Sequence, residues 1–383
     1  MIFKTIKHYI HRSFSYIKNI SNAKNTQKLL SALQKNRKEE FNPFPQQGKI
    51  YWRASQNFYT CFYTYFNSCT LTKNIKKADY IFRWGMSKVY KILPFINKTK
   101  IYLMEDGFLR SITTNSDKHT PDIMRTPVGF VIDDLAPHFC MKYPSRLEQY
   151  IKNIHLSHEQ INYSKQLIND ILNHKLTKYN HQPCYIPNIL QTNQHKVLII
   201  DQSFGDFSVV LGGNGKRKDF EKMLNDALHD NPNSIIFIKV HPDTLAKGSF
   251  SKSYFTQKNT NHPRVILFAE NVNPVCVIQA VDKVYVWSSG MGFEAILANK
   301  EVITYGTPFY AGWGLTTDRH PAFETEDFKK RRHEQRTKEE LFYAAYIWYT
   351  HYINPDTCQK CCIEDAIKWL KDNKEKYTLN HKD

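Results

Sequence analysis

The stretch from Val284 to Asp318 constrains the fold more than any other part of the chain. Val284–Trp287 is a short apolar run of β-branched and aromatic residues, which predicts a buried parallel strand. A turn of small residues and a helical segment over 293–298 follow. This order leaves free backbone N–H groups at the carboxyl edge of a sheet, where α/β folds hold phosphates. The aromatic loop at 309–314 is expected to line such a site; the alternative is an ordinary βαβ unit.

The same alternation of strands and helices runs on both sides of a linker at 180–195, which is rich in Asn, Gln and Pro. Before the linker, Ser145 and Glu148 predict the capping box of a helix. After it, an apolar run predicts a strand over 196–200, and a helix is expected near 217–230. A chain of 383 residues is long enough for two domains. We therefore predict an α/β protein with two doubly wound, Rossmann-like domains facing a cleft. The expected divisions are a basic helical segment at 1–45, domains at 46–190 and 191–335, and a helical segment at 336–383 that packs back on the first domain.

The chain is strongly basic, with a formal net charge of +17 and a pI near 9.3. This charge indicates a polyanionic partner, which is nucleic acid, anionic lipid headgroups or a nucleotide-linked acidic substrate. Basic residues are spread along the chain, and no known nucleic-acid-binding module is visible. Residues 1–12 form a basic amphipathic stretch that can lie on an anionic bilayer or form a plain surface helix. No apolar run of membrane-spanning length and no signal peptide is visible, so we expect a cytoplasmic protein.

Eight cysteines are scattered along the sequence. In a chain of this size without a signal peptide, disulfides are not expected. Cys358, Cys361 and Cys362 resemble half of a zinc site, but no second ligand pair accompanies them, so we predict a structural role. Neither a metal nor a cofactor is expected.

Polar residues follow four of the predicted strands, and functional groups in α/β folds lie where strands end. The four groups are Glu105 with Asp106, Gln202 through Asp206, His241 with Pro242, and Ser288 with Ser289. Each group also has an ordinary structural role as a turn or a helix cap. Their recurrence at four strand ends is what favours a functional site.

Each group has a plausible chemistry. The paired acids Glu105 and Asp106 can divide into a general base and a structural partner. Asp206 is either a turn residue or a nucleophilic carboxylate. His241, with Lys239 nearby, can contact a phosphate, and so can the two serines beside a helix N-terminus.

Six segments together resemble the capsule polysaccharide synthesis family, whose KpsC-type members are retaining β-Kdo transferases. They are EDGFLRS at 105–111, PSRLE at 144–148, VLIIDQSFGD at 197–206, KVHPD at 239–243, GMGFEAIL at 290–297 and PFYAGWGLTTD at 308–318. The acidic, His-Pro and Ser-Ser motifs are also similar to those of bacterial sialic acid transferases, which have a GT-B fold and a CMP-sugar donor. The resemblance covers about residues 80 to 370, room for one catalytic module of the two-module enzymes.

The resemblance implies a GT-B-like enzyme that takes the sugar acid Kdo from CMP-Kdo. Retention needs two inversions, hence a nucleophile, which falls on Asp206, and an acid/base, which falls on Glu105 or Asp106. The first domain would bind the acceptor and the second the donor. Lys239 or Arg110 would neutralise the carboxylate of the donor, and Glu294 would bind the ribose. The full donor set implied is Gln202, Lys239, His241, Pro242, Ser288, Ser289, Gly290 and Glu294, with Arg110.

The partners implied are a CMP-sugar, a phosphatidylglycerol-type glycolipid at the inner face of the inner membrane, and a capsule assembly or export complex. Two segments depart from the family pattern: residues 112–115 replace a Gly-rich turn, and Ala136–Cys140 replaces an aromatic run. Both lie in the acceptor domain. The alternatives are a transferase of another CMP-linked ulosonic acid, such as a sialyltransferase, and a non-catalytic capsule-assembly partner. A nucleic-acid-binding protein is a further alternative, for which salt-dependent DNA binding is the discriminating test.

Overall fold

The computed structural model describes residues 23–37, 41–53, 61–66, 68–117, 119–240, 253–255 and 260–380. The basic stretch at 1–12 and the pair His241–Pro242 lie outside these residues. Residues 23–35 form the first helix of the described part.

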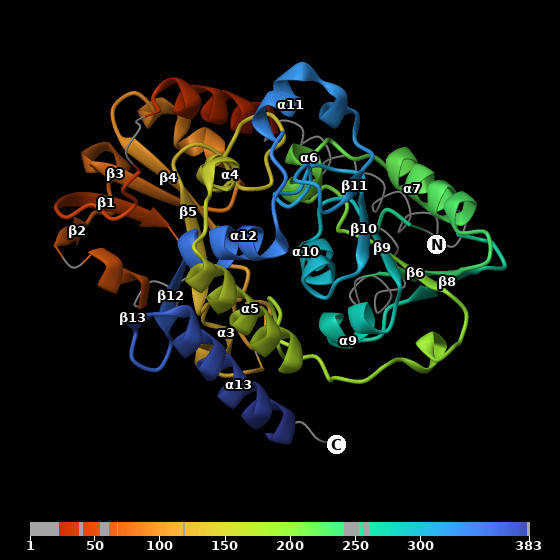
Figure 1. Cartoon of the computed structure of the whole chain (residues 1–383). Helices are drawn as coiled ribbons and strands as arrows, with labels where there is room; N and C mark the ends of the chain where they lie inside the picture. The colour runs from red at the N-terminus through yellow and green to blue at the C-terminus, as the bar shows by residue number, and fades with distance from the viewer. Residues whose placement is uncertain are drawn as a thin grey trace, which may run out of the picture.

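Two sheets lie in separate halves of the molecule, as Figure 1 shows. The second sheet is parallel throughout, with strand order β11-β10-β9-β6-β7-β8. Its central strands are apolar and buried on both faces, as expected for a parallel sheet between helices. The strands are β6 (Lys196–Ile200), β7 (Ile235–Lys239), β8 (Val265–Phe268), β9 (Lys283–Val286), β10 (Glu301–Thr304) and β11 (Thr317–Asp318).

The first sheet is mixed, whereas the sequence predicted a doubly wound parallel sheet. Its order is β13-β12-β5-β4-β3-β1-β2, and β5 pairs antiparallel with both β4 and β12. The connection from β4 to β5 holds only the four-residue helix α3, and antiparallel neighbours need no crossover helix. The strands are β1 (Gly48–Arg53), β2 (Cys69–Leu71), β3 (Tyr80–Trp84), β4 (Lys100–Asp106), β5 (Gly129–Asp133), β12 (Thr350–Asn354) and β13 (Gln359–Cys361).

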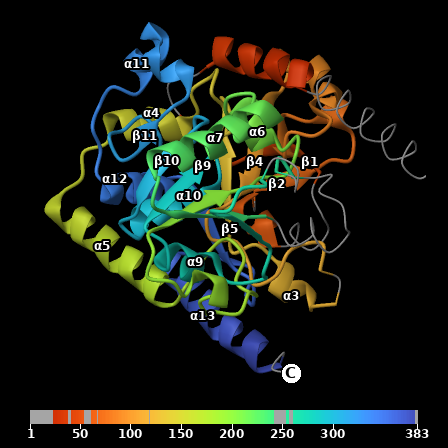
Figure 2. The ribbon, with the colours of Figure 1, turned by 90° about the vertical axis from the view of Figure 1, so that its right-hand side faces the viewer.

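The last part of the chain returns to the first sheet. The helix α12 continues into a π-helix (Tyr343–Trp348), and the hairpin β12–β13 then extends the sheet. Both views show α13 running beside α5 (Figures 1 and 2), and Tyr163 on α5 donates a hydrogen bond to Glu364 on α13 at 2.5 Å. The two strands are an addition to a segment that the sequence predicted to be helical.

The helices lie between these strands in chain order. The α-helices are α3 (Asp122–Arg125), α4 (Arg146–Asn153), α5 (His158–Asn173), α6 (Phe207–Leu211), α7 (Arg217–Asp230), α9 (Pro274–Gln279), α10 (Gly290–Leu297), α11 (Glu326–Arg331), α12 (Lys338–Phe342) and α13 (Ile363–Asn380). Ser145 caps α4 as predicted, accepting a hydrogen bond from Glu148 N. Within the described residues, no helix combines the length and the apolar character that crossing a bilayer requires.

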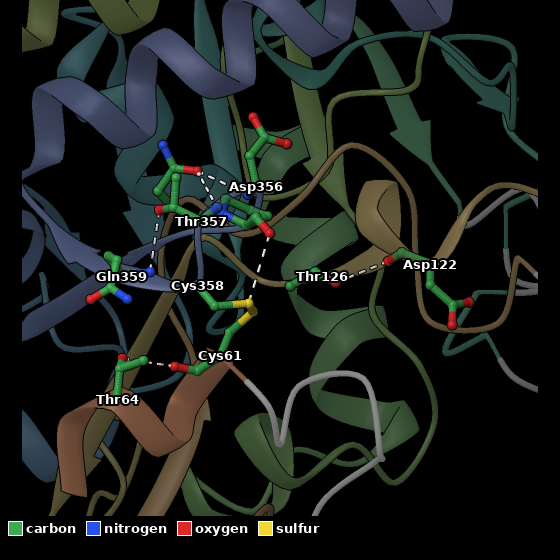
Figure 3. Close-up of a disulfide and its surroundings, with 10 residues drawn as sticks. Cys61, Thr64, Asp122, Thr126, Asp356, Thr357, Cys358 and Gln359 are labelled. Atoms are coloured by element: carbon green, nitrogen blue, oxygen red, sulfur yellow. Dashed lines mark hydrogen bonds between the residues drawn. A yellow bond between two sulfur atoms is a disulfide. The ribbon is translucent and has the colours of Figure 1, made fainter. Parts of the chain in front are cut away.

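Two disulfides contradict the sequence prediction. Cys184 in the linker pairs with Cys276 on α9. Cys61 pairs with Cys358 in the turn between β12 and β13, across 297 positions of sequence (Figure 3). The return of the chain to the first sheet brings these two cysteines together, and nothing in the local sequence marks that return. Because Cys358 is bonded to Cys61, the Cys358–Cys362 motif is not half of a zinc site.

Candidate active site

A cavity of about 530 Å³ lies where strand ends of the two sheets face each other. Three of the predicted polar groups contribute to its wall: the pair at the end of β4, residues of the segment after β6 and the serines after β9. Of the predicted site residues, the cavity wall contains Glu105, Asp106, Gln202, Asp206, Ser288, Ser289, Gly290 and Glu294.

The two neighbouring acids Glu105 and Asp106 have different environments. Burial raises the pKa of Glu105 to about 8, and the charges of Asp106 and Asp206 add to the rise. Burial also acts to raise the pKa of Asp106, but the cations Lys178 and Arg110 outweigh it and lower that pKa. Glu105 is therefore neutral near pH 7 while Asp106 is ionised. The sequence left open which acid is the base, and this difference favours Glu105.

Lys178 was missed by the sequence prediction. Its Nζ lies 3.3 Å from Asp106 Oδ2 in the cavity wall. It follows α5 in a turn in which Asn180 Oδ1 accepts a hydrogen bond from Thr177 N at 3.0 Å. The turn connects the two halves, so only the path of the chain brings this cation to the acids.

Asp206 is the N-cap of the short helix α6. Its Oδ1 accepts hydrogen bonds from Ser208 N and Ser208 Oγ, both at 2.7 Å. Its Oδ2 accepts no hydrogen bond from the part of the chain that the structure describes. The carboxylate is exposed to the cavity. Capping fixes the orientation of the side chain and leaves one oxygen available for chemistry.

Gln202 and Ser288 hold the ends of β6 and β9 together. Gln202 Oε1 accepts from Ser288 N at 2.9 Å, and Ser288 Oγ donates to Ser208 O at 3.0 Å. The Ser288 hydroxyl is therefore engaged with the protein. Ser289 caps α10, accepting from Met291 N at 3.3 Å. The backbone around Gly290 at the start of α10 is the part of this group best placed to meet a phosphate.

Glu294 has an oxygen that nothing in the described chain satisfies. Thr177 Oγ1 donates to its Oε1, whereas its Oε2 is buried without a partner among the described residues. Burial raises the pKa of Glu294 to about 7, against a small opposing effect of the Thr177 hydrogen bond. An unsatisfied buried polar atom in a cavity wall points to a ligand group that completes it.

Two predicted residues are placed elsewhere. Arg110 is 1% exposed, and its guanidinium donates to Asp106, to Ser111 and to Arg125 O. Lys239 Nζ donates to Glu270 O at 3.1 Å. Neither side chain lines the cavity, and both are already hydrogen-bonded to other groups of the protein. This arrangement does not support their predicted role at a substrate carboxylate, and Lys178 is the cation among the described residues of the cavity wall.

Aromatic side chains form one wall of the cavity. Phe309 belongs to the loop that the sequence predicted to line a site, and it lies 5.0 Å from Phe108 between ring centroids. Tyr346 of the π-helix stacks on Phe108 at 5.2 Å. His138 packs beside Phe108 at 5.3 Å and was not among the predicted site residues. Its only sequence signal is its place in Ala136–Cys140, a segment that departs from the family pattern.

No group of three or more His, Cys, Asp or Glu side chains suited to a metal occurs among the residues with described positions.

Comparison with known proteins gives consistent matches. A family model described as "Capsule polysaccharide biosynthesis protein" matches residues 79–352. The capsule polysaccharide modification protein LipA of Neisseria meningitidis serogroup A is 37% identical over 311 residues, which are 79% of this chain and 43% of that protein. The lipopolysaccharide-processing protein LpsZ of Rhizobium meliloti is 30% identical over 292 residues, 75% of this chain and 62% of that protein. This chain thus spans less than half the length of LipA.

Two solved structures share the fold. The Thermosulfurimonas dismutans KpsC beta Kdo 2,4 transferase superposes with a TM-score of 0.71 and 29% identity, covering 86% of this chain and 99% of that one. The beta Kdo 2,7 transferase of the same KpsC gives a TM-score of 0.64 at 22% identity, covering 85% and 99%, which shows the fold alone. The predicted GT-B-like class, with two α/β domains facing a cleft, is confirmed.

Proposed function

Because the chain belongs to the capsule polysaccharide biosynthesis family, we propose that it is a retaining β-Kdo transferase with CMP-Kdo as donor. The likeness to a beta Kdo 2,4 transferase at 29% identity supports this choice of sugar. The acceptor is the growing Kdo linker on a phosphatidylglycerol-type lipid.

One observation carries the proposal. Glu105, with a pKa of about 8, faces the same cavity as Asp206, and the charge of Asp206 contributes to that raised value. A carboxylic acid that keeps its proton near pH 7, in one cavity with a second carboxyl side chain, is the pairing that the acid/base and nucleophile of a retaining mechanism require.

The chemistry takes two steps. Asp206 Oδ2 attacks the anomeric carbon of Kdo, the bond to the CMP phosphate breaks, and Glu105 gives its proton to the departing phosphate. The acceptor hydroxyl then attacks the same carbon, Glu105 takes the hydroxyl proton, and the ester bond to Asp206 breaks. Two inversions leave the β configuration unchanged. Glu105 ends with the proton it began with, so the cycle closes.

The surrounding groups bind the donor. Lys178 neutralises the carboxylate beside the anomeric carbon, since it is the cation of the cavity wall and is 48% exposed. The N-terminus of α10 receives the phosphate. A hydroxyl of the ribose donates a hydrogen bond to Glu294 Oε2, which has no partner among the described residues. His241 and Pro242 keep their predicted part in holding CMP.

The lipid acceptor requires access to a membrane. The net charge of +17 attracts the chain to anionic headgroups. We place the protein peripherally at the inner face of the inner membrane, where it would meet a capsule assembly or export complex.

A transfer assay tests the proposal. CMP-Kdo generated in situ is incubated with a lipid-linked Kdo acceptor and either wild type or Glu105→Gln. Wild type should give a product whose new linkage is β by NMR, and Glu105→Gln should be slower by about 10²–10⁴-fold, the usual worth of a general acid/base. Wild type that neither binds CMP nor transfers Kdo would refute the proposal.

A further inference from the structure

We propose that His138 and the aromatic rings around it form the subsite for the terminal sugar ring of the acceptor, with His138 selecting the hydroxyl that it presents. This rests on the transferase function proposed above and adds a residue that decides which acceptor is used.

The subsite has an apolar frame. The ring of His138 lies 5.3 Å from Phe108 and 6.0 Å from Phe309, measured between centroids. Tyr346 continues the wall at 5.2 Å from Phe108. Aromatic faces suit the apolar C–H face of a sugar ring. The frame draws on both halves of the molecule and on the C-terminal segment.

His138 is uncharged at any physiological pH. Burial, followed by the positive charge of Lys178, lowers the pKa of His138 to about 3. A neutral imidazole with so low a pKa is a poor base, and it cannot form an ion pair with a carboxylate or phosphate. What it offers is one hydrogen-bond donor and one acceptor. Its partner in a complex is therefore a neutral polar group, such as a hydroxyl.

The two ring nitrogens differ in access. Nδ1 is buried and has no hydrogen-bond partner in the described part of the chain. Nε2 is not closed off in this way, and His138 lines the cavity, so Nε2 is the nitrogen that a ligand reaches. No described group holds this ring by a hydrogen bond, and its reachable Nε2 is therefore available to a ligand in the cavity.

The position of His138 assigns it to the acceptor instead of the donor. His138 and Phe108 belong to the first half, whereas Ser289, Gly290 and Glu294, which suit the donor, belong to the second. Phe108 follows Glu105 by three residues. A sugar stacked on Phe108 and bonded to His138 therefore presents a neighbouring hydroxyl to the base.

The test compares His138→Leu and His138→Gln with wild type, using the methyl β-glycoside of Kdo as acceptor. His351→Leu is the matched control: His351 is also packed among rings, 4.7 Å from Phe44 and 5.6 Å from Phe130, and burial lowers its pKa to about 3 as well. His351 does not line the cavity. Acceptor KM, kcat, hydrolysis of CMP-Kdo without acceptor, and binding of the glycoside by saturation-transfer NMR are measured.

We expect His138→Leu to raise the acceptor KM about tenfold, the equivalent of one lost hydrogen bond of about 1.4 kcal/mol. Hydrolysis of CMP-Kdo should not change, His138→Gln should recover part of the loss, and His351→Leu should leave the acceptor KM at the wild-type value. An acceptor KM within twofold of wild type in His138→Leu, or an equal change in His351→Leu, would overturn the subsite.

The binding measurement separates the two proposals. Wild type that binds the glycoside through His138 but does not use CMP-Kdo would refute the donor and keep the subsite. Wild type that hydrolyses CMP-Kdo but shows no binding of the glycoside would keep the transferase and overturn the subsite.

Discussion

Glu105 and Glu294 are two carboxyl groups that burial holds partly or wholly in the neutral form near pH 7. They differ in what surrounds them. Glu105 has acidic neighbours that further raise its pKa. Among the described residues, Glu294 has only Thr177 as a hydrogen-bond donor and keeps one oxygen without a partner. The first arrangement suits proton transfer, and the second suits a fixed hydrogen bond to a ligand.

Glu294→Gln should flatten the pH dependence of stability. The folded-state pKa of Glu294 is raised from 4.5 to about 7, so the native protein keeps a proton that the unfolded chain releases in that window. Its contribution to stability is therefore full below about pH 4.5 and is lost as the pH rises to 7, on the order of 3 kcal/mol in all. Thermal unfolding at pH 5 and pH 8 should show a smaller fall for Glu294→Gln than for wild type. An equal fall would contradict the raised pKa.

At the scale of elements, a buried ion network links α4 to the cavity wall. Glu148 on α4 pairs with Arg331 at 2.7 Å and with Arg332 at 2.9 Å, and Arg332 also donates to Pro308 O and Ala311 O. The sequence predicted that Glu148 would close the capping box of α4. Only the Ser145 half of that box is present, because the two arginines take the Glu148 carboxylate. The two arginines lie 183 and 184 positions after Glu148 in the sequence, so no local pattern indicates this pairing.

Arg332→Ala should destabilise the protein by about 3–5 kcal/mol, since it leaves the Glu148 charge only partly paired and removes the donors to the loop. Lys329→Ala is the control, because Lys329 pairs with Glu324 and the two side chains are 50% and 83% exposed. An exposed pair of this kind is worth about 0–1 kcal/mol. Urea unfolding of both variants measures the difference, and similar losses would contradict a special role for the buried network.

The start of α10 depends on a close approach that only glycine permits. A Cβ on Gly292 would overlap the hydroxyl of Tyr310, which donates to Ser289 O at 2.6 Å. A Cβ on Gly290 would meet nothing within 4 Å. We expect Gly292→Ala to lower the melting temperature by several degrees, at about 1–3 kcal/mol for overpacking, and Gly290→Ala to leave it nearly unchanged. Calorimetry that found the two variants alike would be evidence against this packing.

The sequence predicted most elements of the second half well, because each has a strong local signal. The helix expected at 217–230 is α7 (Arg217–Asp230), and the strand expected at 196–200 is β6. The elements it missed are short or depend on distant partners. The strands β12 and β13 gain their hydrogen bonds from β5 and from each other, far from any pattern in their own residues.

At the scale of the whole molecule, the site follows from how the chain crosses between its halves. Strand ends could be predicted from the sequence because an apolar run and the polar residue after it are adjacent. Lys178 and His138 could not, since a linker turn and an irregular loop bring them to the cavity. Arg110 and Lys239 have the charge that a substrate carboxylate requires. The sequence could not predict that the fold would place Asp106 beside Arg110 and Glu270 beside Lys239.

The central claim is that Asp206 forms a covalent bond to the sugar, and intact-protein mass spectrometry of Glu105→Gln incubated with CMP-Kdo tests it most directly. The variant also lacks the proton donor of the first step, but a phosphate can leave without being protonated, so the adduct still forms. The variant should then stall, because the incoming hydroxyl cannot lose its proton. The account predicts a mass gain of one Kdo residue, located on the peptide that contains Asp206 and absent in the double variant with Asp206→Ala. No adduct, together with β-retaining transfer by Asp206→Ala alone, would contradict it.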